Sequence, residues 1–400
     1  MTQNEIAGLV DRLARPLWAE IDLDAVAANV RALRAQAGRA ELVAMVKANA
    51  YGHGAVAVGR AALEAGASRL GVVSVDEALQ LRAAGVSAPI LVVGYSAPAQ
   101  AAAIVRERLT ATVNSFELGQ AIDAEALRQG TIAEVHIKVD TGLNRFGLEG
   151  EEAIALAESL RNAAGLHVEG LFTHLATADE ADKAFVFQQF EAFRAVAERV
   201  DWIPLRHTSN TAGLLDTPAL NQGMVRVGIG IYGLYPSPAV DRAQSLSPVM
   251  ALKARLIRVH TAAPGDTVSY GRHWQAAGGE RLGLVPCGYG DGYPRTLSGK
   301  GRVLVGDVTA PVLGTIAMDH LVIDITSSQA GEGDPIQILG GPPGSGVSAD
   351  ELGTLCETIN YEMTTRISAR VPRIYMRAGK PVAIQGLNDP FPVDLGSASF

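Results

Sequence analysis

The chain has 400 residues, of which 48% are hydrophobic and 19% are charged. This composition is typical of globular proteins, and the length allows one α/β barrel of about 250 residues and a smaller companion domain. With 34 basic and 42 acidic residues the formal net charge is −8, which argues against a nucleic-acid surface. No apolar stretch approaches the length of a membrane span, and the N-terminal residues lack the apolar core of a signal peptide. The two cysteines, Cys287 and Cys356, are not spaced as in a metal site or a disulfide framework. We therefore expect a cytoplasmic protein.

Short β-branched runs alternate with Ala-rich amphipathic stretches through the first part of the chain. Eight such runs predict strands near 42–46, 69–73, 89–93, 111–113, 134–139, 168–173, 203–207 and 225–231. Eight strands alternating with helices predict an N-terminal (β/α)8 barrel of the TIM type, with its chemistry at the C-terminal ends of the strands.

The pattern changes after Leu234, where Tyr-Pro-Ser-Pro interrupts the alternation. Six further strand-like runs separated by Gly- and Pro-rich turns predict a mainly β C-terminal domain. One helix is expected over 348–363, opened by a capping box of Ser348 and Glu351. The predicted boundaries are 12–240 for the barrel, 241–385 for the β domain and 386–400 for a frayed tail.

The strongest local feature is Lys47, which ends a buried strand and precedes a Gly-rich turn. Partial burial lowers the pKa of a lysine and supplies the neutral amine that Schiff-base chemistry needs. A strand-end lysine that reaches for solvent is the alternative reading, and position alone does not decide between them.

The segment VKANAYGHG around Lys47 resembles the cofactor-lysine motif of the alanine racemase family. The resemblance extends from about Trp18 to Arg377 and includes KVDTGLNRFG, EGLFTHLATADE, HTSNTAG and MVRVGIGIYGL, then VSYG, GYGDGYPR, GTIAMDH and TINYE in the β domain. It implies a barrel enzyme that binds pyridoxal 5'-phosphate and interconverts L- and D-alanine by a two-base mechanism through an external aldimine.

The family's catalytic pair matches Lys47 and Tyr270, one for each face of the substrate carbon. The resemblance implies that His174 and Arg226 support the tyrosine, and that Arg226 also contacts the pyridine nitrogen, which a permanent cation keeps unprotonated. This should limit side reactions such as transamination.

The other site residues are also implied by the resemblance. The cofactor-binding set is Lys47, Tyr51, His174, Asn210, Thr211, Arg226, Gly228, Ile229 and Tyr361, and the substrate-binding set is Arg145, Met318, Asp319 and Tyr289. Lys138 matches a lysine that carries a carbamate in many family members. No HxH or HxxxH spacing occurs, so no metal site is expected.

Because Lys47 and Tyr270 fall in different predicted domains, and the family completes each site with a neighbour's β domain, we expect a homodimer with shared active sites. Two alternatives stay open: a racemase of another amino acid such as serine, and a fold-related decarboxylase of basic amino acids. The β-domain segments VSYG, AMDH and TINYE count strongly against a third, a cofactor-binding protein without turnover. The sequence does not distinguish D-alanine synthesis for peptidoglycan from D-alanine breakdown.

Overall fold

The computed structural model describes residues 8, 13 and 15–395. The chain divides into two compact units, one formed by residues 26–50 and 58–246, and the other by 1–25, 51–57 and 247–400. We call them the barrel unit and the C-terminal unit. The predicted boundaries were 12–240 and 241–385, so the structure differs in assigning the first strand to the C-terminal unit.

The barrel unit is built on one sheet of eight parallel strands in the order β8-β7-β6-β5-β4-β3-β2-β9. The strands are β2 (Glu41–Met45), β3 (Arg69–Val72), β4 (Ile90–Val92), β5 (Thr110–Val113), β6 (Ala133–Lys138), β7 (Leu166–Phe172), β8 (Leu205–His207) and β9 (Met224–Val227). The Arg226 amide donates to the Ser209 carbonyl at 3.0 Å, which links β9 to the segment after β8. All eight predicted strands and the barrel fold class are thereby confirmed, although residues 229–231 of the last predicted strand belong instead to the 3-10 helix Ile229–Tyr232.

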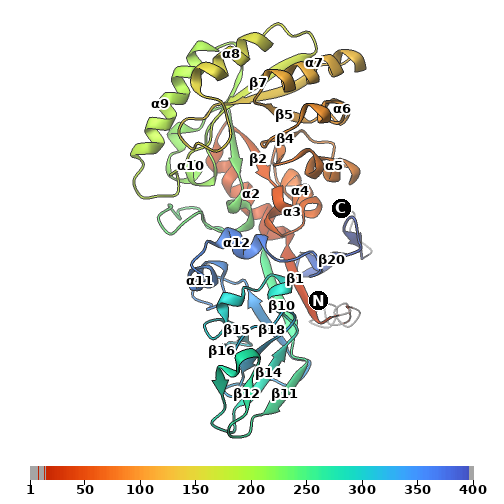
Figure 1. The fold of residues 1–400 in the computed structure, drawn as a ribbon, viewed down its shortest axis with the longest axis vertical. Helices are drawn as coiled ribbons and strands as arrows, with labels where there is room; N and C mark the ends of the chain where they lie inside the picture. The colour runs from red at the N-terminus through yellow and green to blue at the C-terminus, as the bar shows by residue number, and fades with distance from the viewer. Residues whose placement is uncertain (1–7, 9–12, 14, 396–400) are drawn as a thin grey trace. The chain divides into compact units, whose positions relative to one another are not determined.

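Helices surround these strands (Figure 1). They are α2 (Leu23–Ala37), α3 (Lys47–Tyr51), α4 (Ala55–Glu64), α5 (Val75–Ala83), α6 (Ala101–Arg106), α7 (Phe116–Gln129), α8 (Gly150–Leu160), α9 (Ala184–Arg199) and α10 (Thr211–Asp216), with 3-10 turns η1 (Pro98–Gln100), η2 (Pro218–Leu220) and η3 (Ile229–Tyr232). Ser74 and Ser115 cap α5 and α7 by accepting backbone amide protons, as their sequence position favours.

The C-terminal unit contains an eleven-stranded sheet in the order β11-β14-β17-β16-β15-β18-β10-β1-β19-β20-β21. Its strands are β1 (Leu17–Asp22), β10 (Met250–Arg255), β11 (Arg258–Thr261), β14 (Arg281–Val285), β15 (Arg302–Val305), β16 (Val308–Leu313), β17 (Leu321–Asp324), β18 (Pro335–Leu339), β19 (Arg373–Arg377), β20 (Lys380–Gln385) and β21 (Val393–Asp394). A separate pair comprises β12 (Thr267–Val268) and β13 (Trp274–Gln275), and the short helices are η4 (Tyr270–Arg272), η5 (Tyr289–Asp291), η6 (Arg295–Leu297), α11 (Ala349–Leu355) and α12 (Asn360–Thr365).

Strand β1 was not predicted, and its position explains the shifted boundary. It pairs antiparallel with β10 and parallel with β19. The Trp18 side chain is buried in a cluster with Ile374 and Met376. Burial against distant strands therefore ties this N-terminal segment to the C-terminal unit.

Two further expectations are corrected here. The capping box of Ser348 and Glu351 is present, but the single predicted helix is two helices, because Glu357 has a positive φ of 57° that ends the first. In the predicted frayed tail, β21 pairs with β20, with Val393 opposite Ile384. Residues 396–400 of that tail lie outside the described residues.

Candidate active site

Lys47 follows β2 at the C-terminal end of the barrel strands, where chemistry was predicted. Burial lowers the pKa of its amine, the nearby charge of Arg145 lowers it further, and Glu77 partly opposes the shift. A lowered pKa raises the fraction of neutral amine at physiological pH, as nucleophilic lysine chemistry requires.

The chain immediately after Lys47 is left-handed. Ala48, Asn49, Ala50 and Tyr51 have φ between 51° and 54°, a conformation that costs a non-glycine residue about 1–2 kcal/mol. The Glu77 carboxylate holds the start of this turn by accepting the Ala48 amide at 2.6 Å and the Val73 amide at 2.8 Å. Strain of this kind is concentrated at functional sites, and here it directly follows the candidate nucleophile.

Arg145 lies on an exposed loop after β6. The Asp140 carboxylate fixes the loop by accepting the amides of Gly142, Asn144 and Arg145 at 2.9, 3.1 and 3.2 Å. These three bonds keep the pKa of Asp140 low despite partial burial. The loop therefore holds the Arg145 charge close enough to lower the pKa of both Lys47 and Lys138.

Lys138 is the last residue of β6 and is only 4% exposed. Burial lowers the pKa of its amine to about 8, with further contributions from Arg145 and Arg226. Its Nζ lies 5.2 Å from the centre of the Phe146 ring. A buried and partly neutral amine is the state that carbamylation requires.

Arg226 lies on β9 and is 4% exposed. Its guanidinium donates to the carbonyls of Thr173 and Thr208 at 2.7 and 3.1 Å, and to His207 Nδ1 at 2.7 Å. Burial lowers its pKa to about 9, which leaves it cationic at neutral pH. His174 Nδ1 lies 3.4 Å from the same guanidinium, and burial together with the neighbouring cations lowers the pKa of His174 well below its usual range. The imidazole is therefore neutral beside a fixed positive charge.

The segments after β8 and β9 meet at the Thr211 hydroxyl, which accepts the Gly228 amide at 3.1 Å. Asn210 caps α10 by accepting the Gly213 amide at 2.9 Å, so its side-chain oxygen is engaged in the cap. Ile229 follows Gly228 in the 3-10 turn η3. Among the described residues, the fully buried Ser209 hydroxyl has no hydrogen-bond partner. Neutral hydroxyls and amides thus gather where a barrel phosphate site is expected.

The C-terminal unit carries the remaining predicted residues. Tyr270 is 71% exposed, and the preceding Ser269 donates to the Thr315 carbonyl. Tyr289 and Met318 are also exposed, and the Tyr289 amide donates to the Ala317 carbonyl at 3.2 Å. Large exposed apolar side chains therefore come from neighbouring loops.

A buried carboxylate organises the loops beside Met318. Asp291 is fully buried and accepts from Arg15 at 2.8 Å, from Arg370 at 2.7 Å and from the Gly288 amide at 2.9 Å. Arg370 also donates to Asp319 at 2.8 Å. Asp319, which was predicted to bind substrate, is therefore paired with Arg370 within the C-terminal unit.

Tyr51 and Tyr361 lie together in the C-terminal unit, with ring centres 6.1 Å apart. Burial raises the pKa of Tyr51, so its hydroxyl stays protonated and is a hydrogen-bond donor suited to a phosphate.

The predicted site residues thus divide between the two units. The barrel unit holds Lys47, Lys138, Arg145, His174, Asn210, Thr211, Arg226, Gly228 and Ile229, and the C-terminal unit holds Tyr51, Tyr270, Tyr289, Met318, Asp319 and Tyr361.

Sequence reasoning missed Glu77 and three charged or polar groups of the barrel strands: His136, which is buried, and Arg69 and Glu169, which are partly buried. Their signal was present in the sequence, because charged and imidazole side chains interrupt strands that are otherwise apolar enough to be buried.

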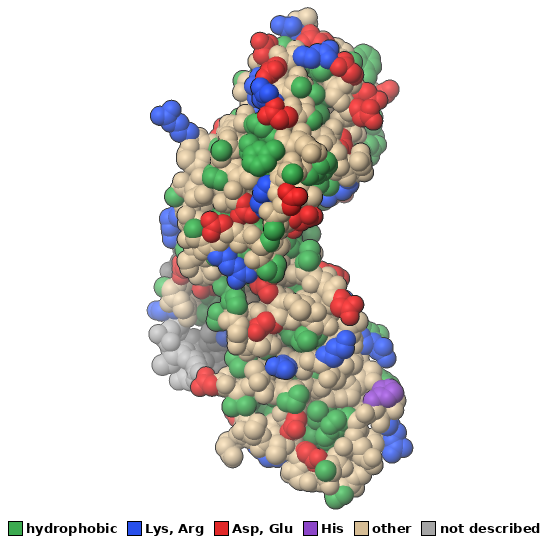
Figure 2. Space-filling model, turned by 90° about the vertical axis from the view of Figure 1, so that its left-hand side faces the viewer, with side chains coloured by type: hydrophobic (Ala, Val, Ile, Leu, Met, Phe, Trp, Pro, Cys, Tyr) green, Lys and Arg blue, Asp and Glu red, His purple; other side chains and the backbone are tan. Residues whose placement is uncertain are grey.

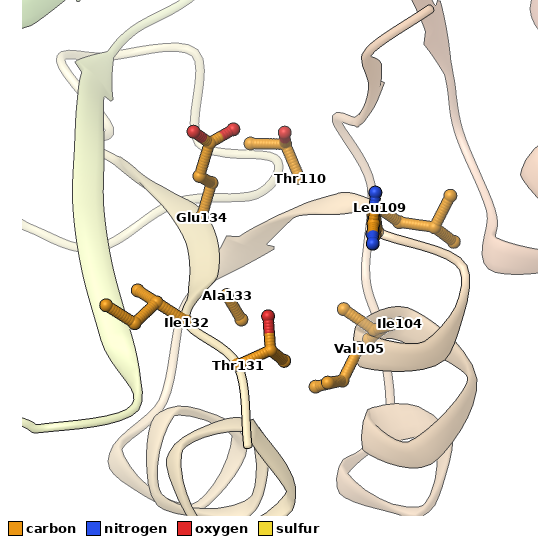
Figure 3. Close-up of a pocket in the computed structure, with 9 residues that line it drawn as sticks. Ile104, Val105, Leu109, Thr110, Thr131, Ile132, Ala133 and Glu134 are labelled. Carbon is orange, nitrogen blue, oxygen red and sulfur yellow. The ribbon is translucent and has the colours of Figure 1, made fainter. Parts of the chain in front are cut away.

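Other surface features carry less chemistry. Figure 3 shows a hollow between Ile104 and Val105 of α6 and the starts of β5 and β6, at the opposite end of the strands from Lys47. Acidic and basic side chains are interspersed over the face seen in Figure 2. In the part of the chain that the structure describes, no group of three His, Cys, Asp or Glu side chains is arranged to hold a metal ion, and no helix has the length and apolar character needed to span a bilayer.

The fold and these residues define the class: an α/β barrel followed by a β domain, with a lysine of lowered pKa and buried cations at the strand ends. The models of the alanine racemase N-terminal and C-terminal domains match residues 21–236 and 249–375. The chain belongs to the alanine racemase family.

Individual proteins show the same similarity. The alanine racemase of Symbiobacterium thermophilum is 43% identical over 90% of this chain and 97% of its own length. That of Desulfovibrio desulfuricans is 41% identical over 90% of this chain and 98% of its own. Among solved structures, the alanine racemase of Clostridium difficile 630 has a TM-score of 0.90 at 33% identity, covering 94% of this chain and all of its own.

Proposed function

We propose that this chain interconverts L- and D-alanine, using pyridoxal 5'-phosphate held by Lys47. The observation that carries the proposal is the amine of Lys47 at a barrel strand end, where burial and Arg145 lower its pKa, in a chain of the alanine racemase family. When bound, the cofactor would withdraw electrons from the substrate's Cα and so make its proton removable.

The residues present fit this cofactor. Thr211, the amides of Gly228 and Ile229, and the tyrosines Tyr51 and Tyr361 would hold the phosphate with neutral donors. The buried Ser209 hydroxyl without a partner lies within two residues of Thr211, so this segment has unused hydrogen-bonding capacity. Asn210 would support it as the cap of α10.

Arg226 would face the ring nitrogen. Its guanidinium has no acceptor and stays charged at neutral pH, so it would exclude a proton from that nitrogen. His174, neutral and beside Arg226, would link this cation to the tyrosine base.

Proton transfer would use two groups on opposite faces of the substrate carbon. Lys47 Nζ would hold or release the proton on one face and Tyr270 Oη on the other. Arg145 would bind the substrate carboxylate, and Met318, Asp319 and Tyr289 would line its access.

We further propose that the working form is a homodimer in which Tyr270 serves the partner's Lys47. Tyr270 is 71% exposed, Met318 is 51% exposed and Tyr289 is 41% exposed, all on the C-terminal unit. Adjacent exposed apolar side chains of this size are typical of surfaces that bind another protein. A cytoplasmic location and a role in either the synthesis or the breakdown of D-alanine remain predictions.

Subunit complementation tests both proposals together. Lys47→Ala and Tyr270→Phe proteins, each loaded with pyridoxal phosphate, should lose nearly all racemisation of L-alanine, followed by optical rotation. After dissociation and random reassociation, half of the dimers carry one intact site of two, so about a quarter of wild-type activity should return.

No recovery after verified exchange of subunits would overturn the shared site. Retention of activity by Tyr270→Phe, with release of CO2 from lysine or ornithine, would replace the racemase proposal by a decarboxylase.

A further inference from the structure

A chain of hydrogen-bonded charged and imidazole side chains crosses the barrel behind Arg226. Arg69 donates to both oxygens of Glu169 at 2.8 and 2.6 Å, and Glu169 contacts His136 Nε2 at 2.9 Å. His136 Nδ1 lies 2.9 Å from His207 Nε2, and His207 Nδ1 lies 2.7 Å from Arg226. We call Arg69, Glu169, His136, His207 and Arg226 the relay; its two histidines and Arg226 are buried, and Arg69 and Glu169 are partly buried.

Arg226 and Glu169 together determine which nitrogen of each imidazole carries the proton. Arg226 can only donate, so His207 Nδ1 must be the acceptor and His207 Nε2 must carry the proton. That proton points at His136 Nδ1, so His136 carries its own proton on Nε2 and donates it to the ionised Glu169. Any additional proton on either ring would set two donors against each other. The three bonds from Arg226 through His207 and His136 to Glu169 therefore run in one direction, an arrangement in which each bond strengthens the next.

The electrostatics agree with this assignment. Burial lowers the pKa of both imidazoles, so both are neutral at physiological pH. Glu169 has its pKa lowered to about 2, because His136 and Arg69 donate to its carboxylate. The only net charges in the relay are the two arginines and one carboxylate.

The backbone is shaped to admit these side chains. In the pairing of β6 with β7, Val135 is opposite Val168 but His136 is opposite Gly170, which leaves Glu169 as an extra residue without a partner. Such a bulge redirects a side chain, and here it turns Glu169 to the His136 side of the strand. A Cβ at Gly170 would lie 2.7 Å from the His136 ring, so only glycine leaves space for the imidazole.

Two more features fix the relay in place. Strands β3 and β7 are four positions apart in a ring of eight, so the Arg69–Glu169 pair spans the barrel interior. The Phe172 ring stacks on His207 at 4.5 Å and 7°, which sets the plane of the imidazole that faces Arg226. Both rings of the histidine pair are fully buried.

We propose that Glu169 and His136 are positioning residues for Arg226: through the fixed tautomer of His207 they hold the guanidinium in place and balance its charge from inside the barrel. This role rests on the proposed function, in which Arg226 faces the cofactor's ring nitrogen. Neither residue contacts substrate or cofactor in the proposal. They act by keeping His207 Nδ1 available as an acceptor.

Proton positions in the cofactor-free wild-type protein are the first test and need no variant. Long-range 1H–15N spectra of histidine-labelled protein at neutral pH should show His136 and His207 as neutral rings protonated on Nε2, identified by loss of signals in His136→Asn and His207→Asn. An imidazolium, or a ring protonated on Nδ1, at either position would overturn the relay regardless of activity.

Glu169→Gln is the second test. His136 Nε2 and Arg69 Nη1 both donate to Glu169 Oε2, and Arg69 Nη2 donates to Oε1. A carboxamide carries no charge, and its NH2 group must face a donor in either orientation: Arg69 Nη2 in one, His136 Nε2 and Arg69 Nη1 in the other. With the cofactor-loaded enzyme we expect kcat to fall by about 10–100-fold, as for other supporting partners of an active-site group, with a smaller change in KM.

A spectroscopic and chemical signature separates positioning from general damage. A displaced Arg226 no longer excludes a proton from the ring nitrogen, which favours transamination. In that reaction alanine passes its amino group to the cofactor aldehyde, giving pyruvate and pyridoxamine phosphate with all atoms conserved. Pyruvate released per racemisation event should rise at least about tenfold in Glu169→Gln, with matching loss of the cofactor's aldehyde absorbance.

Glu41→Gln is the matched control, because Glu41 pairs with the same Arg69 at 2.8 Å but lies outside the relay. It should keep kcat within about twofold and the wild-type pyruvate ratio. Equal behaviour of the two variants would refute the positioning role while leaving the proton assignment intact. A wild type that fails to racemise alanine would overturn the proposed function, and the spectra would still show whether the relay exists.

Discussion

The left-handed turn after Lys47 predicts that a substitution normally harmful to a helix will stabilise this protein. Ala48 is exposed with φ 51° and ψ 49°. Placing a non-glycine residue there costs about 1–2 kcal/mol, and glycine avoids that cost. Glycine also loses about 0.5–1 kcal/mol through the greater freedom of the unfolded chain. Ala48→Gly should therefore raise the free energy of unfolding by about 0.5–1 kcal/mol.

The control is the same substitution in an ordinary helix. Ala195 is exposed in the interior of α9, which is right-handed. Ala195→Gly should lower the free energy of unfolding by about 1 kcal/mol, so the two variants should differ in sign. Urea unfolding of the cofactor-free proteins, followed by circular dichroism at one protein concentration, measures both values.

A loss of stability in Ala48→Gly equal to that in Ala195→Gly would refute the left-handed assignment. If the strain serves to aim Lys47, the stabilised variant should also racemise alanine more slowly, since a relaxed turn holds the amine less firmly. If Ala48→Gly raises the free energy of unfolding and leaves kcat unchanged, the strained turn has no role in the reaction.

Two further predictions concern buried charges. Asp291→Asn turns a donor toward the Gly288 amide or toward Arg15 and removes the charge shared by Arg15 and Arg370, both about one-third exposed. This substitution should lower the free energy of unfolding by about 2–4 kcal/mol in urea titrations. Asp319→Asn is the control: it loses only one exposed pair with Arg370 and should lower the free energy of unfolding by less than about 1 kcal/mol. Equal losses in the two variants would contradict the reasoning. The pKa of Lys138 is about 8, so its amine is neutral in about half of the molecules at pH 8 and in about a tenth at pH 7. An ordinary lysine amine is neutral in under about 1% of the molecules at either pH. With 13C-bicarbonate at pH 8 a carbamate carbon signal should appear in the wild type and be absent from Lys138→Met, and lowering the pH to 6 should remove it by protonating the amine; its absence at pH 8 would leave Lys138 unmodified.

The barrel was predictable because its signal is local. Each strand is a short apolar run, and parallel strands buried on both faces need no partner-specific pattern. The position of Lys47 and Arg226 at strand ends followed from the same reading. Strand β1 was not predictable in this way, since its burial depends on β10 and β19 far along the chain.

The site was predictable only in part. Motif resemblance reached Lys47, Arg145 and Arg226, but no local pattern indicates that Glu169 is an extra residue in β7. The bulge arises from how β6 and β7 are aligned, a property of two strands together. From the sequence alone, Gly170 only indicates a less stable position in a strand. The structure shows why glycine is needed there, because the His136 ring packs against it.

The cations of the barrel unit gather at the strand ends. Lys47, Lys138, Arg145 and Arg226 lie near one another at the strand ends, and their charges lower the pKa of Lys138 and His174. Two carboxylates steady this group: Glu77 holds the turn after Lys47, and Glu169 ends the relay from Arg226. These carboxylates are engaged by amides, an arginine and an imidazole, and Glu77 and Asp140 only partly oppose the lowering of the pKa of Lys47 and Lys138, so the cations are incompletely compensated. A site arranged in this way favours a ligand that brings its own negative charges, and the phosphate and carboxylate of a cofactor–amino-acid pair would supply them.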